Sequence, residues 1–157
     1  MATSRVIRVT HRKYAEDAYS GRGGLYAAGR WHRRGRLVVY AAASLALATL
    51  EKILAVNDVQ RLREMVRVPA HLDDEAIRAP SLEHLPDGWD RRPPGAASRD
   101  FGTDWLDSER SPALHVPSAL FPTEAHNYVL NPAHPEFDAA VEGDETRPLD
   151  LIQSEER

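Results

Sequence analysis

The stretch 29–51 constrains the fold of this chain most, because it places a turn, a strand and a helix in direct succession. Arg30 stands in a glycine-led turn, Tyr40 lies in a short β-branched run typical of a buried strand, and Glu51 belongs to an apolar segment of helical length. Ser44 precedes that segment and is a favoured N-cap residue. The sequence therefore predicts that three successive elements present an arginine, a tyrosine and a glutamate.

The helix expected over residues 45–56 carries two apolar stripes of different size. At helical spacing Ala48, Glu51 and Ala55 share one side with Ser44, and bulkier leucines line the neighbouring stripe. An ionised carboxylate on an apolar helix is costly unless it is paired or used. The small neighbours leave room for a ligand beside Glu51, which makes this glutamate a candidate site residue.

These three side chains favour one kind of chemistry. Arginine grips phosphate through two parallel charged hydrogen bonds, tyrosine offers a flat face to an aromatic ring, and a carboxylate stabilises a sugar cation. Together they suggest cleavage at the anomeric carbon of a nucleotide. Ordinary interpretations stay open, namely a surface or ion-paired Arg30 and a core Tyr40 with a satisfied hydroxyl. The further arginines at 33, 34 and 36 are more typical of a solvated turn than of a second phosphate site.

The C-terminal part of the chain contains further polar residues that could belong to the site. Ser118 follows an expected strand and is able to bond a ribose or amide group, although an ordinary turn serine has the same setting. Asparagines such as Asn127 and Asn131 more commonly stitch loops together through backbone hydrogen bonds. The sequence contains no nucleophile elbow around Ser118, no histidine pairing of metal-binding spacing, no Walker loop and no Rossmann glycine fingerprint. A serine hydrolase, a metal site and a Rossmann dinucleotide site are therefore not indicated.

The rest of the chain predicts short strands, few helices and long loops, and hence a single α+β domain. Residues 5–10 alternate as in a half-buried strand, and residues 11–20 are expected to form a short helix. Proline, glycine and charged residues dominate 73–110, where we expect long loops with short helices, anchored by Trp89 and Trp105. The other expected strands are 37–41, 64–68 (ended by Pro69), 114–116, 127–131 and an edge strand within 148–152.

Composition is typical of a soluble intracellular protein. The 157 residues suffice for one domain with a real core, which we take as 1–157. A net charge of −4 argues against a dedicated nucleic-acid binder. Cysteine is absent, no run approaches the roughly 20 apolar residues of a membrane span, and the N-terminus lacks the apolar core of a signal peptide. We therefore expect a cytoplasmic protein without a thiol nucleophile.

In combination these segments resemble the RES-domain family, toxins of bacterial type II toxin–antitoxin pairs, from residue 8 to about residue 150. The resemblance is carried by Gly29-Arg30-Trp31, the Val38-Val39-Tyr40-Ala41 strand, the apolar helix segment ending at Glu51, Gly102 with Trp105-Leu106, the Val-Pro-Ser-Ala segment within 114–120, and residues 127–135. Two positions depart from the family's Gly-Gly-Arg-Trp-Asn. Ala28 replaces a glycine, and His32 replaces the asparagine, which alters a hydrogen bond near the expected pocket.

The resemblance implies a fold similar to that of ADP-ribosyltransferase toxins and an activity that depletes cellular NAD. Carried over residue by residue, the implied site consists of catalytic Glu51, Arg30 and Tyr40, and of substrate-binding Arg30, Tyr40, Ser118, Arg8 and Asn127. NAD is then a substrate, and neither a cofactor nor a metal is expected. The implied partner is an Xre-type antitoxin, in a hetero-oligomeric complex that meets nucleic acid only through that antitoxin.

In the expected reaction nicotinamide leaves a positively charged glycoside as a neutral molecule and needs no acid. Arg30 would hold a phosphate, Tyr40 would stack on nicotinamide, and Glu51 would bond the ribose and favour the developing cation. Ser118 would orient the substrate, and water or inorganic phosphate would be the acceptor, which the sequence does not distinguish. Three alternatives stay open: a protein ADP-ribosyltransferase, a non-catalytic antitoxin-binding module, and an mRNA-cleaving toxin, against which the acidic net charge argues.

Overall fold

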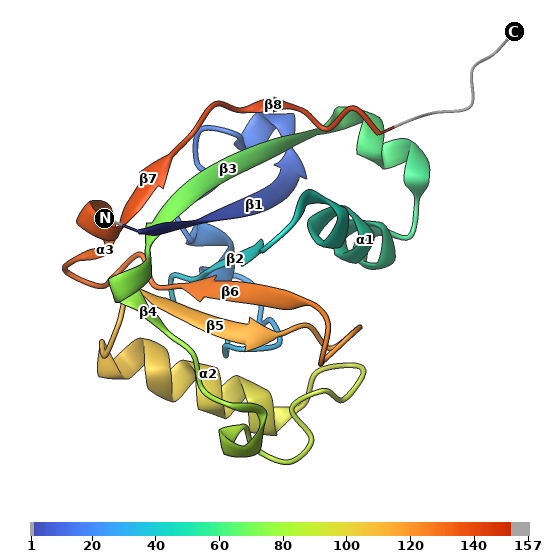
Figure 1. Cartoon of the computed structure of the whole chain (residues 1–157). Helices are drawn as coiled ribbons and strands as arrows, with labels where there is room; N and C mark the ends of the chain where they lie inside the picture. The colour runs from blue at the N-terminus through green and yellow to red at the C-terminus, as the bar shows by residue number, and fades with distance from the viewer. Residues whose placement is uncertain (1, 152–157) are drawn as a thin grey trace, which may run out of the picture.

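A computed structural model describes residues 2–151 and contains one curled sheet with helices packed on it (Figure 1). The strands are β1 (Thr3–His11), β2 (Val39–Ala42), β3 (Met65–Asp73), β4 (Ile77–Arg78), β5 (Ala113–Pro117), β6 (His126–Leu130), β7 (Val141–Gly143) and β8 (Arg147–Pro148). The α-helices are α1 (Leu45–Val56), α2 (Ala96–Ser108) and α3 (Phe137–Ala140), and short 3-10 helices span Arg12–Tyr14, Arg22–Leu25, Val59–Glu64, Asp74–Ala76 and Leu82–His84.

The sheet order is β4-β5-β6-β2-β1-β3-β7, and β8 pairs with the same strand, β3, as β7 does. Neighbouring strands are antiparallel throughout, except that β4 and β5 run parallel. This mixture of an antiparallel sheet with segregated helices confirms the α+β prediction.

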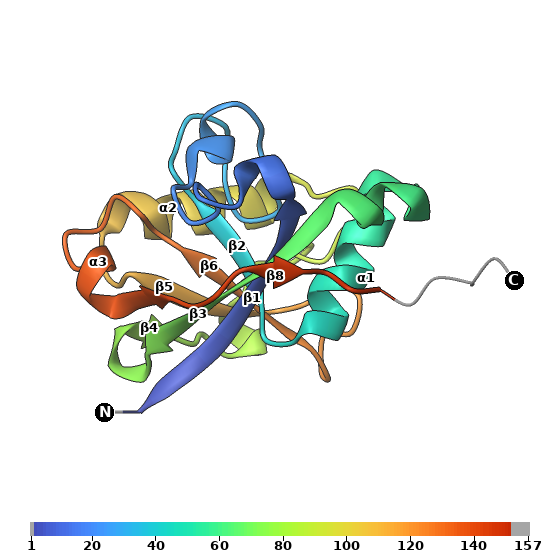
Figure 2. The ribbon, with the colours of Figure 1, turned by 90° about the horizontal axis from the view of Figure 1, so that it is seen from above.

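Strand alternation separates the two faces of the sheet. Val39 and Ala41 of β2 pack into one cluster with Leu130, whereas Tyr40 packs with Val129 on the other face. Side chains of α2 join that second face through Trp105 and Leu106, and α1 joins it further along, beside Val9 of β1. Figure 1 and Figure 2 both show α1 and α2 standing apart from each other. The face that carries Tyr40 is therefore covered by two separate helices.

Helix α1 has the bounds that the sequence predicts. The Ser44 side chain accepts a hydrogen bond from the Leu47 amide at 3.1 Å, which satisfies an otherwise unpaired N–H of the first turn. At the other end Asn57 adopts the left-handed conformation with φ 52°, and its N–H donates to the Ile53 carbonyl at 2.8 Å. Both ends are set by local sequence, so the position of Glu51 along the helix is fixed.

Strand β1 is buried on both faces, so the prediction of a half-buried strand is wrong. Val6 on one face and Ile7 on the other are both buried, because β1 lies between β2 and β3 in the interior of the sheet. The prediction that the strand over 64–68 ends at Pro69 is wrong too, since β3 continues to Asp73. Pro69 is tolerated because it lies between the stretches of β3 that pair with β7 and with β8.

Segment 73–110 is more helical than predicted. Helix α2 is 13 residues long, and its buried stripe consists of small or polar side chains beside Trp105 and Leu106, so the usual aliphatic periodicity is missing. Trp89 and Trp105 are buried, which confirms them as anchors. The helix expected over 11–20 is wrong, because only Arg12–Tyr14 form a short 3-10 helix. The last edge strand is limited to β8, and Ile152 lies outside the described residues.

Within residues 2–151, none of the helices has both the length and the apolar character needed to cross a membrane.

A close backbone contact joins α2 to the loop that precedes β2. A Cβ atom placed on Gly102 would lie 1.7 Å from the carbonyl oxygen of Trp31. No side chain fits at this distance, so only glycine allows α2 to approach the loop so closely.

We predict that Gly102→Ala lowers the free energy of unfolding by at least about 2 kcal/mol, since the helix must move away from Trp31. Urea denaturation followed by circular dichroism measures this change. Gly23→Ala is the matched control, because a Cβ atom on Gly23 meets nothing within 4 Å. Equal stability of the two variants would contradict the prediction.

Candidate active site

A cavity of about 770 Å³ opens on the helix-covered face of the sheet, between α1 and the loop around Arg30. It is lined by five of the six residues predicted for the site, namely Arg8, Arg30, Tyr40, Glu51 and Asn127. Ala48 and Ala55, the small neighbours of Glu51 on α1, line it as well. A second cavity of about 650 Å³, beside α2 and β4, contains none of the six. The first cavity is therefore the candidate site.

Tyr40 is held by the loop that contains Arg30. Its hydroxyl oxygen accepts a hydrogen bond from the Trp31 amide at 3.0 Å and lies 2.7 Å from Nδ1 of His32. A Cβ atom on Gly29 would lie 2.6 Å from this hydroxyl oxygen, so glycine is required for the ring to rest on the loop. Burial raises the pKa of Tyr40, which keeps the phenol neutral.

Arg30 is fixed by one of its terminal nitrogens. Nη1 donates to the carbonyl oxygens of Trp89 at 2.7 Å and of Arg91 at 2.9 Å, and these are its side-chain hydrogen bonds within residues 2–151. Burial and the charge of Arg92 lower the pKa of Arg30, while Asp90 and Glu51 oppose that shift. An arginine stays protonated under such shifts, so Arg30 presents an oriented cation to the cavity.

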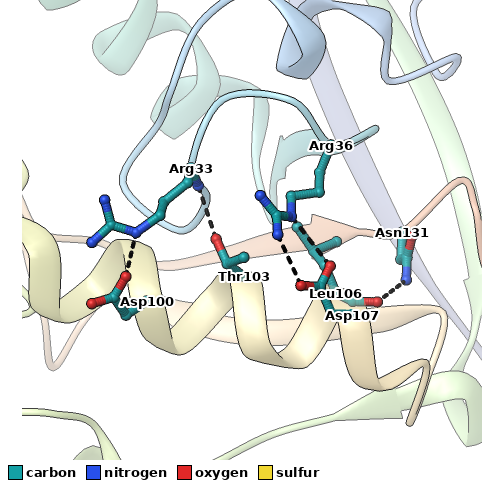
Figure 3. Close-up of polar contacts among 7 residues, drawn as sticks. All are labelled: Arg33, Arg36, Asp100, Thr103, Leu106, Asp107 and Asn131. Atoms are coloured by element: carbon teal, nitrogen blue, oxygen red, sulfur yellow. Dashed lines mark hydrogen bonds and ion pairs between the residues drawn. The ribbon is translucent and has the colours of Figure 1, made fainter.

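The neighbouring arginines have a structural role. Figure 3 shows Arg33 and Arg36 directed at α2, where they pair with Asp100 and Asp107. The Arg33 amide also donates to Oγ1 of Thr103 at 2.9 Å. Arg33 and Arg36 thus bind to α2, which agrees with the interpretation of segment 33–36 as a turn and not as a second phosphate site.

Glu51 accepts hydrogen bonds from Ser118 and Asn127. Its Oε1 accepts from Oγ of Ser118 and from Nδ2 of Asn127, both at 3.0 Å, and Oε2 accepts a longer bond of 3.2 Å from the same Nδ2. Ser118 follows β5 and is completely buried, and Asn127 belongs to β6. The carboxylate is therefore oriented by Asn127 of β6 and by Ser118 directly after β5, with Oε2 the less engaged of its oxygens.

The geometry places Ser118 behind Glu51. Ser118 does not line the cavity, and its oxygen accepts from the Leu120 amide at 3.2 Å while donating to Glu51. Its predicted contact with substrate is therefore not part of this arrangement. What the geometry provides is an orienting bond to the carboxylate.

Arg8 reaches the cavity from β1. Its Nη1 donates to the carbonyl oxygen of Tyr40 at 3.0 Å, and its Nε is buried with no hydrogen-bond partner in the described part of the chain. Burial lowers the pKa of Arg8. A buried N–H without an acceptor is costly, so this end of the cavity favours an anion.

Sequence reasoning missed two residues of the cavity lining, Lys52 and Arg92, whereas His32, which it noted near the expected pocket, contacts Tyr40 from outside the lining. Lys52 follows Glu51 directly, and its position in the sequence was the one available signal. Arg92 lies in the loop before α2, where it donates to the Ala119 carbonyl at 2.7 Å. No local pattern predicts that contact. Among residues 2–151, no group of three or more histidine and carboxylate side chains is arranged to hold a metal ion.

Comparisons with known proteins identify the family of the chain. The RES domain model matches residues 5–152. "Toxin Res" of Yersinia enterocolitica is 35% identical over 136 residues, which cover 87% of this chain and 89% of that protein. "Prs ADP-ribosylating toxin" of a Sphingobium strain is 38% identical over 133 residues, which cover 83% and 82% of the two chains.

A similar fold occurs in the crystal structure of the M. tuberculosis MbcT–MbcA toxin–antitoxin complex. The TM-score is 0.72 at 12% identity, and the match covers 93% of this chain and 84% of the other. At this identity the likeness concerns the fold alone.

We predict that Ser118 and Glu51 are energetically coupled. In a double-mutant cycle, Ser118→Ala and Glu51→Gln should together cost about 1 kcal/mol less than the sum of their separate effects on the free energy of unfolding, because each removes the same charge-assisted bond. Urea denaturation of the four proteins measures the cycle. Ser118→Ala combined with Asp100→Asn, a change on the distant α2, is the control and should be additive. Additivity in both cycles would show that the bond contributes nothing.

Proposed function

The chain belongs to the RES-domain family, and we propose that it is the toxin of a toxin–antitoxin pair that degrades NAD by cleaving the bond between nicotinamide and ribose. The observation that carries this proposal is the charge distribution in the cavity. Four cationic side chains and one carboxylate line it, although the chain as a whole has a net charge of −4. A ligand that carries phosphates and one cationic centre suits this arrangement.

The cations suit the two phosphates of a dinucleotide. Arg30 is oriented by two backbone carbonyls, and the nearby positive charge of Arg92 acts on it. Both arginines line the cavity. Arg8 and Lys52 form a second pair, in which burial and then the charge of Arg8 lower the pKa of Lys52. Like charges gathered without matching carboxylates are unfavourable, and a bound pyrophosphate would relieve their repulsion.

Glu51 is suited to the bond-breaking step. When the glycosidic C–N bond breaks, its electron pair goes to the ring nitrogen, and nicotinamide leaves neutral without protonation. Positive charge then builds on the ribose, where the less engaged Oε2 of Glu51 would stabilise it. Ser118 and Asn127 hold the carboxylate in place, so little reorganisation is needed during the reaction.

Water as the acceptor gives ADP-ribose and a proton, and inorganic phosphate gives ADP-ribose 1″-phosphate. Incubation of the purified protein with NAD, followed by mass spectrometry, tests the proposal and identifies the acceptor. Unchanged NAD after prolonged incubation with folded protein would refute it.

A protein acceptor is the second candidate, because one relative at 38% identity is named as an ADP-ribosylating toxin. The same cavity would bind NAD, and a side chain of a target protein would take the place of water or phosphate. NAD labelled in its adenylate part distinguishes the two. Label retained on a protein after denaturation favours transfer, and label recovered only in small molecules favours cleavage.

We also propose that a separately encoded antitoxin of the Xre type masks this cavity, in a complex with more than one copy of each chain. A structural neighbour is a toxin–antitoxin complex, and the Xre type follows from the family resemblance. An acidic side chain or a C-terminal carboxylate of the partner would suit the cationic lining. The purified complex should cleave little NAD, and the free toxin should recover the activity. Harmless expression of the free chain in cells, with no protein co-purifying, would contradict this.

We predict that Glu51→Gln stays folded but cleaves NAD at least a hundredfold more slowly, which corresponds to at least ~2.7 kcal/mol of lost transition-state stabilisation. The amide keeps the shape of the side chain and removes its charge. Initial rates of nicotinamide release measure the effect, and circular dichroism checks the fold. Near-normal turnover in the folded variant would remove Glu51 from the mechanism.

Arg30→Lys should lose most of the activity, because lysine offers a point charge without the planar pair of donors that bind phosphate. Arg33→Lys is the matched control, since Arg33 pairs with Asp100 on α2. The same assay measures both variants. A comparable loss in Arg33→Lys would show that a general basic surface, and not the oriented Arg30, binds the substrate.

A further inference from the structure

We propose that His32 is a positioning residue for the site: it accepts a hydrogen bond from the hydroxyl of Tyr40 and so restricts this tyrosine to contact with substrate through its ring. The inference rests on the proposed function insofar as Tyr40 faces NAD. His32 is 2% exposed and does not itself line the cavity, so any influence on substrate passes through Tyr40 and the loop.

The contacts of His32 define its tautomer. Nε2 lies 2.8 Å from the carbonyl oxygen of Ala27, an acceptor, so Nε2 carries a proton. Nδ1 accepts a hydrogen bond from the Gly29 amide at 3.1 Å, which this N–H shares with the His32 carbonyl oxygen at 3.2 Å. The neutral imidazole protonated on Nε2 satisfies both contacts, and the imidazolium does not.

The electrostatic surroundings favour the same neutral form. Burial lowers the pKa of His32, and the charges of Arg99 and Arg36 lower it further, while the backbone carbonyls of Ala27 and Gly24 oppose the shift. Tyr40, which contacts the ring through its hydroxyl group, is itself kept neutral by burial.

Both hydrogen-bonding roles of the Tyr40 hydroxyl are consequently taken by protein groups. With Nδ1 as an acceptor at 2.7 Å, Tyr40 must donate its only hydroxyl proton to His32, and its oxygen accepts from the Trp31 amide at 3.0 Å. No proton is left to donate to a ligand. The ring, pressed against Gly29, is the part of Tyr40 that remains available, and its position depends on His32.

Two substitutions separate the two contacts of His32. Asparagine places an amide oxygen near the position of Nδ1, and so keeps an acceptor for Tyr40 while losing the contact with Ala27. Glutamine carries its amide one atom further, and so keeps a donor for Ala27 while losing the acceptor for Tyr40. A purely structural role predicts similar behaviour of both variants, whereas a positioning role separates them.

The experiment measures steady-state NAD cleavage by His32→Asn and His32→Gln. We expect His32→Asn to stay within about threefold of the parent protein. We expect His32→Gln to raise KM by about tenfold with a smaller change in kcat, because ring contact acts in ground and transition state alike and Glu51 is oriented independently. In a Tyr40→Phe background the difference between the two variants should vanish. Equal kinetics of the two variants, or a difference that persists with Tyr40→Phe, would overturn the inference.

His134→Gln is the matched control. His134 is also buried, its Nε2 lies 2.9 Å from the Glu109 carbonyl, and its Nδ1 accepts from the Glu136 amide at 3.0 Å, but it lines neither cavity and has no contact with Tyr40. Its loss should lower the thermal midpoint and leave KM unchanged. A raised KM in His134→Gln would show that the effect at His32 is loss of stability alone.

Nitrogen-15 NMR of the histidine rings gives a readout that does not depend on activity. His32 should be neutral with its proton on Nε2 at pH 7, and its Nδ1 resonance should shift in Tyr40→Phe. A proton on Nδ1, or an unchanged Nδ1 resonance, would overturn the inference. If the parent protein leaves NAD intact, the proposed function fails, and the NMR result alone decides whether His32 accepts a hydrogen bond from Tyr40.

Discussion

The approach of the Trp31 backbone to α2 at Gly102 is the constraint on which the candidate site depends. Around this contact, Nε of Arg99 donates to the Gly29 carbonyl at 2.9 Å and Thr103 accepts from the Arg33 amide. The loop is thereby clamped to a rigid helix on one side while it grips Tyr40 on the other. The loop has no regular structure, and it fixes the position of Arg30 because α2 provides hydrogen-bond partners for the loop backbone.

The site is supported by two separate parts of the fold. Arg30 and Tyr40 depend on the loop and on α2, whereas Glu51 depends on α1, on Ser118 directly after β5 and on Asn127 of β6. The supports meet at β2, which lies next to β6 in the sheet and leads directly into α1. This division explains why Glu51 needs Ser118 and Asn127 from distant parts of the sequence, and why damage to one support is expected to spare the other.

Local sequence predicted the parts of the fold that local interactions determine. Ser44 caps α1 at the predicted position because capping involves only the first turn. Helix α2 was not predicted, since its buried side is shaped by Gly102 and other small residues that fit a neighbouring loop and give no apolar period. The sequence alone predicts a strand end at Pro69, because the strand accommodates this proline only where its pairing changes from β8 to β7, two strands that are distant in the sequence.

The same distinction applies to the site residues. Glu51 was recognisable because a carboxylate on an apolar helix is conspicuous in the sequence. The roles of Arg92 and His32 were not, because each depends on a contact with another segment of the folded chain. Ser118 was recognisable as a site residue through the family resemblance, but its contact with Glu51 required the pairing of β5 with β6.

Charge illustrates why placement matters more than totals. A net charge of −4 speaks against a polyanion as ligand, yet the cavity gathers four cations around one carboxylate. The field that a ligand meets is set by the nearest groups in a partly dry site, not by distant screened charges. Glu51 is the one negative group in that lining, so a substrate of the proposed kind, with anionic phosphates and a cationic centre, would be favoured in a single orientation. Its phosphates would lie toward the arginines, and the bond that breaks would lie beside the carboxylate.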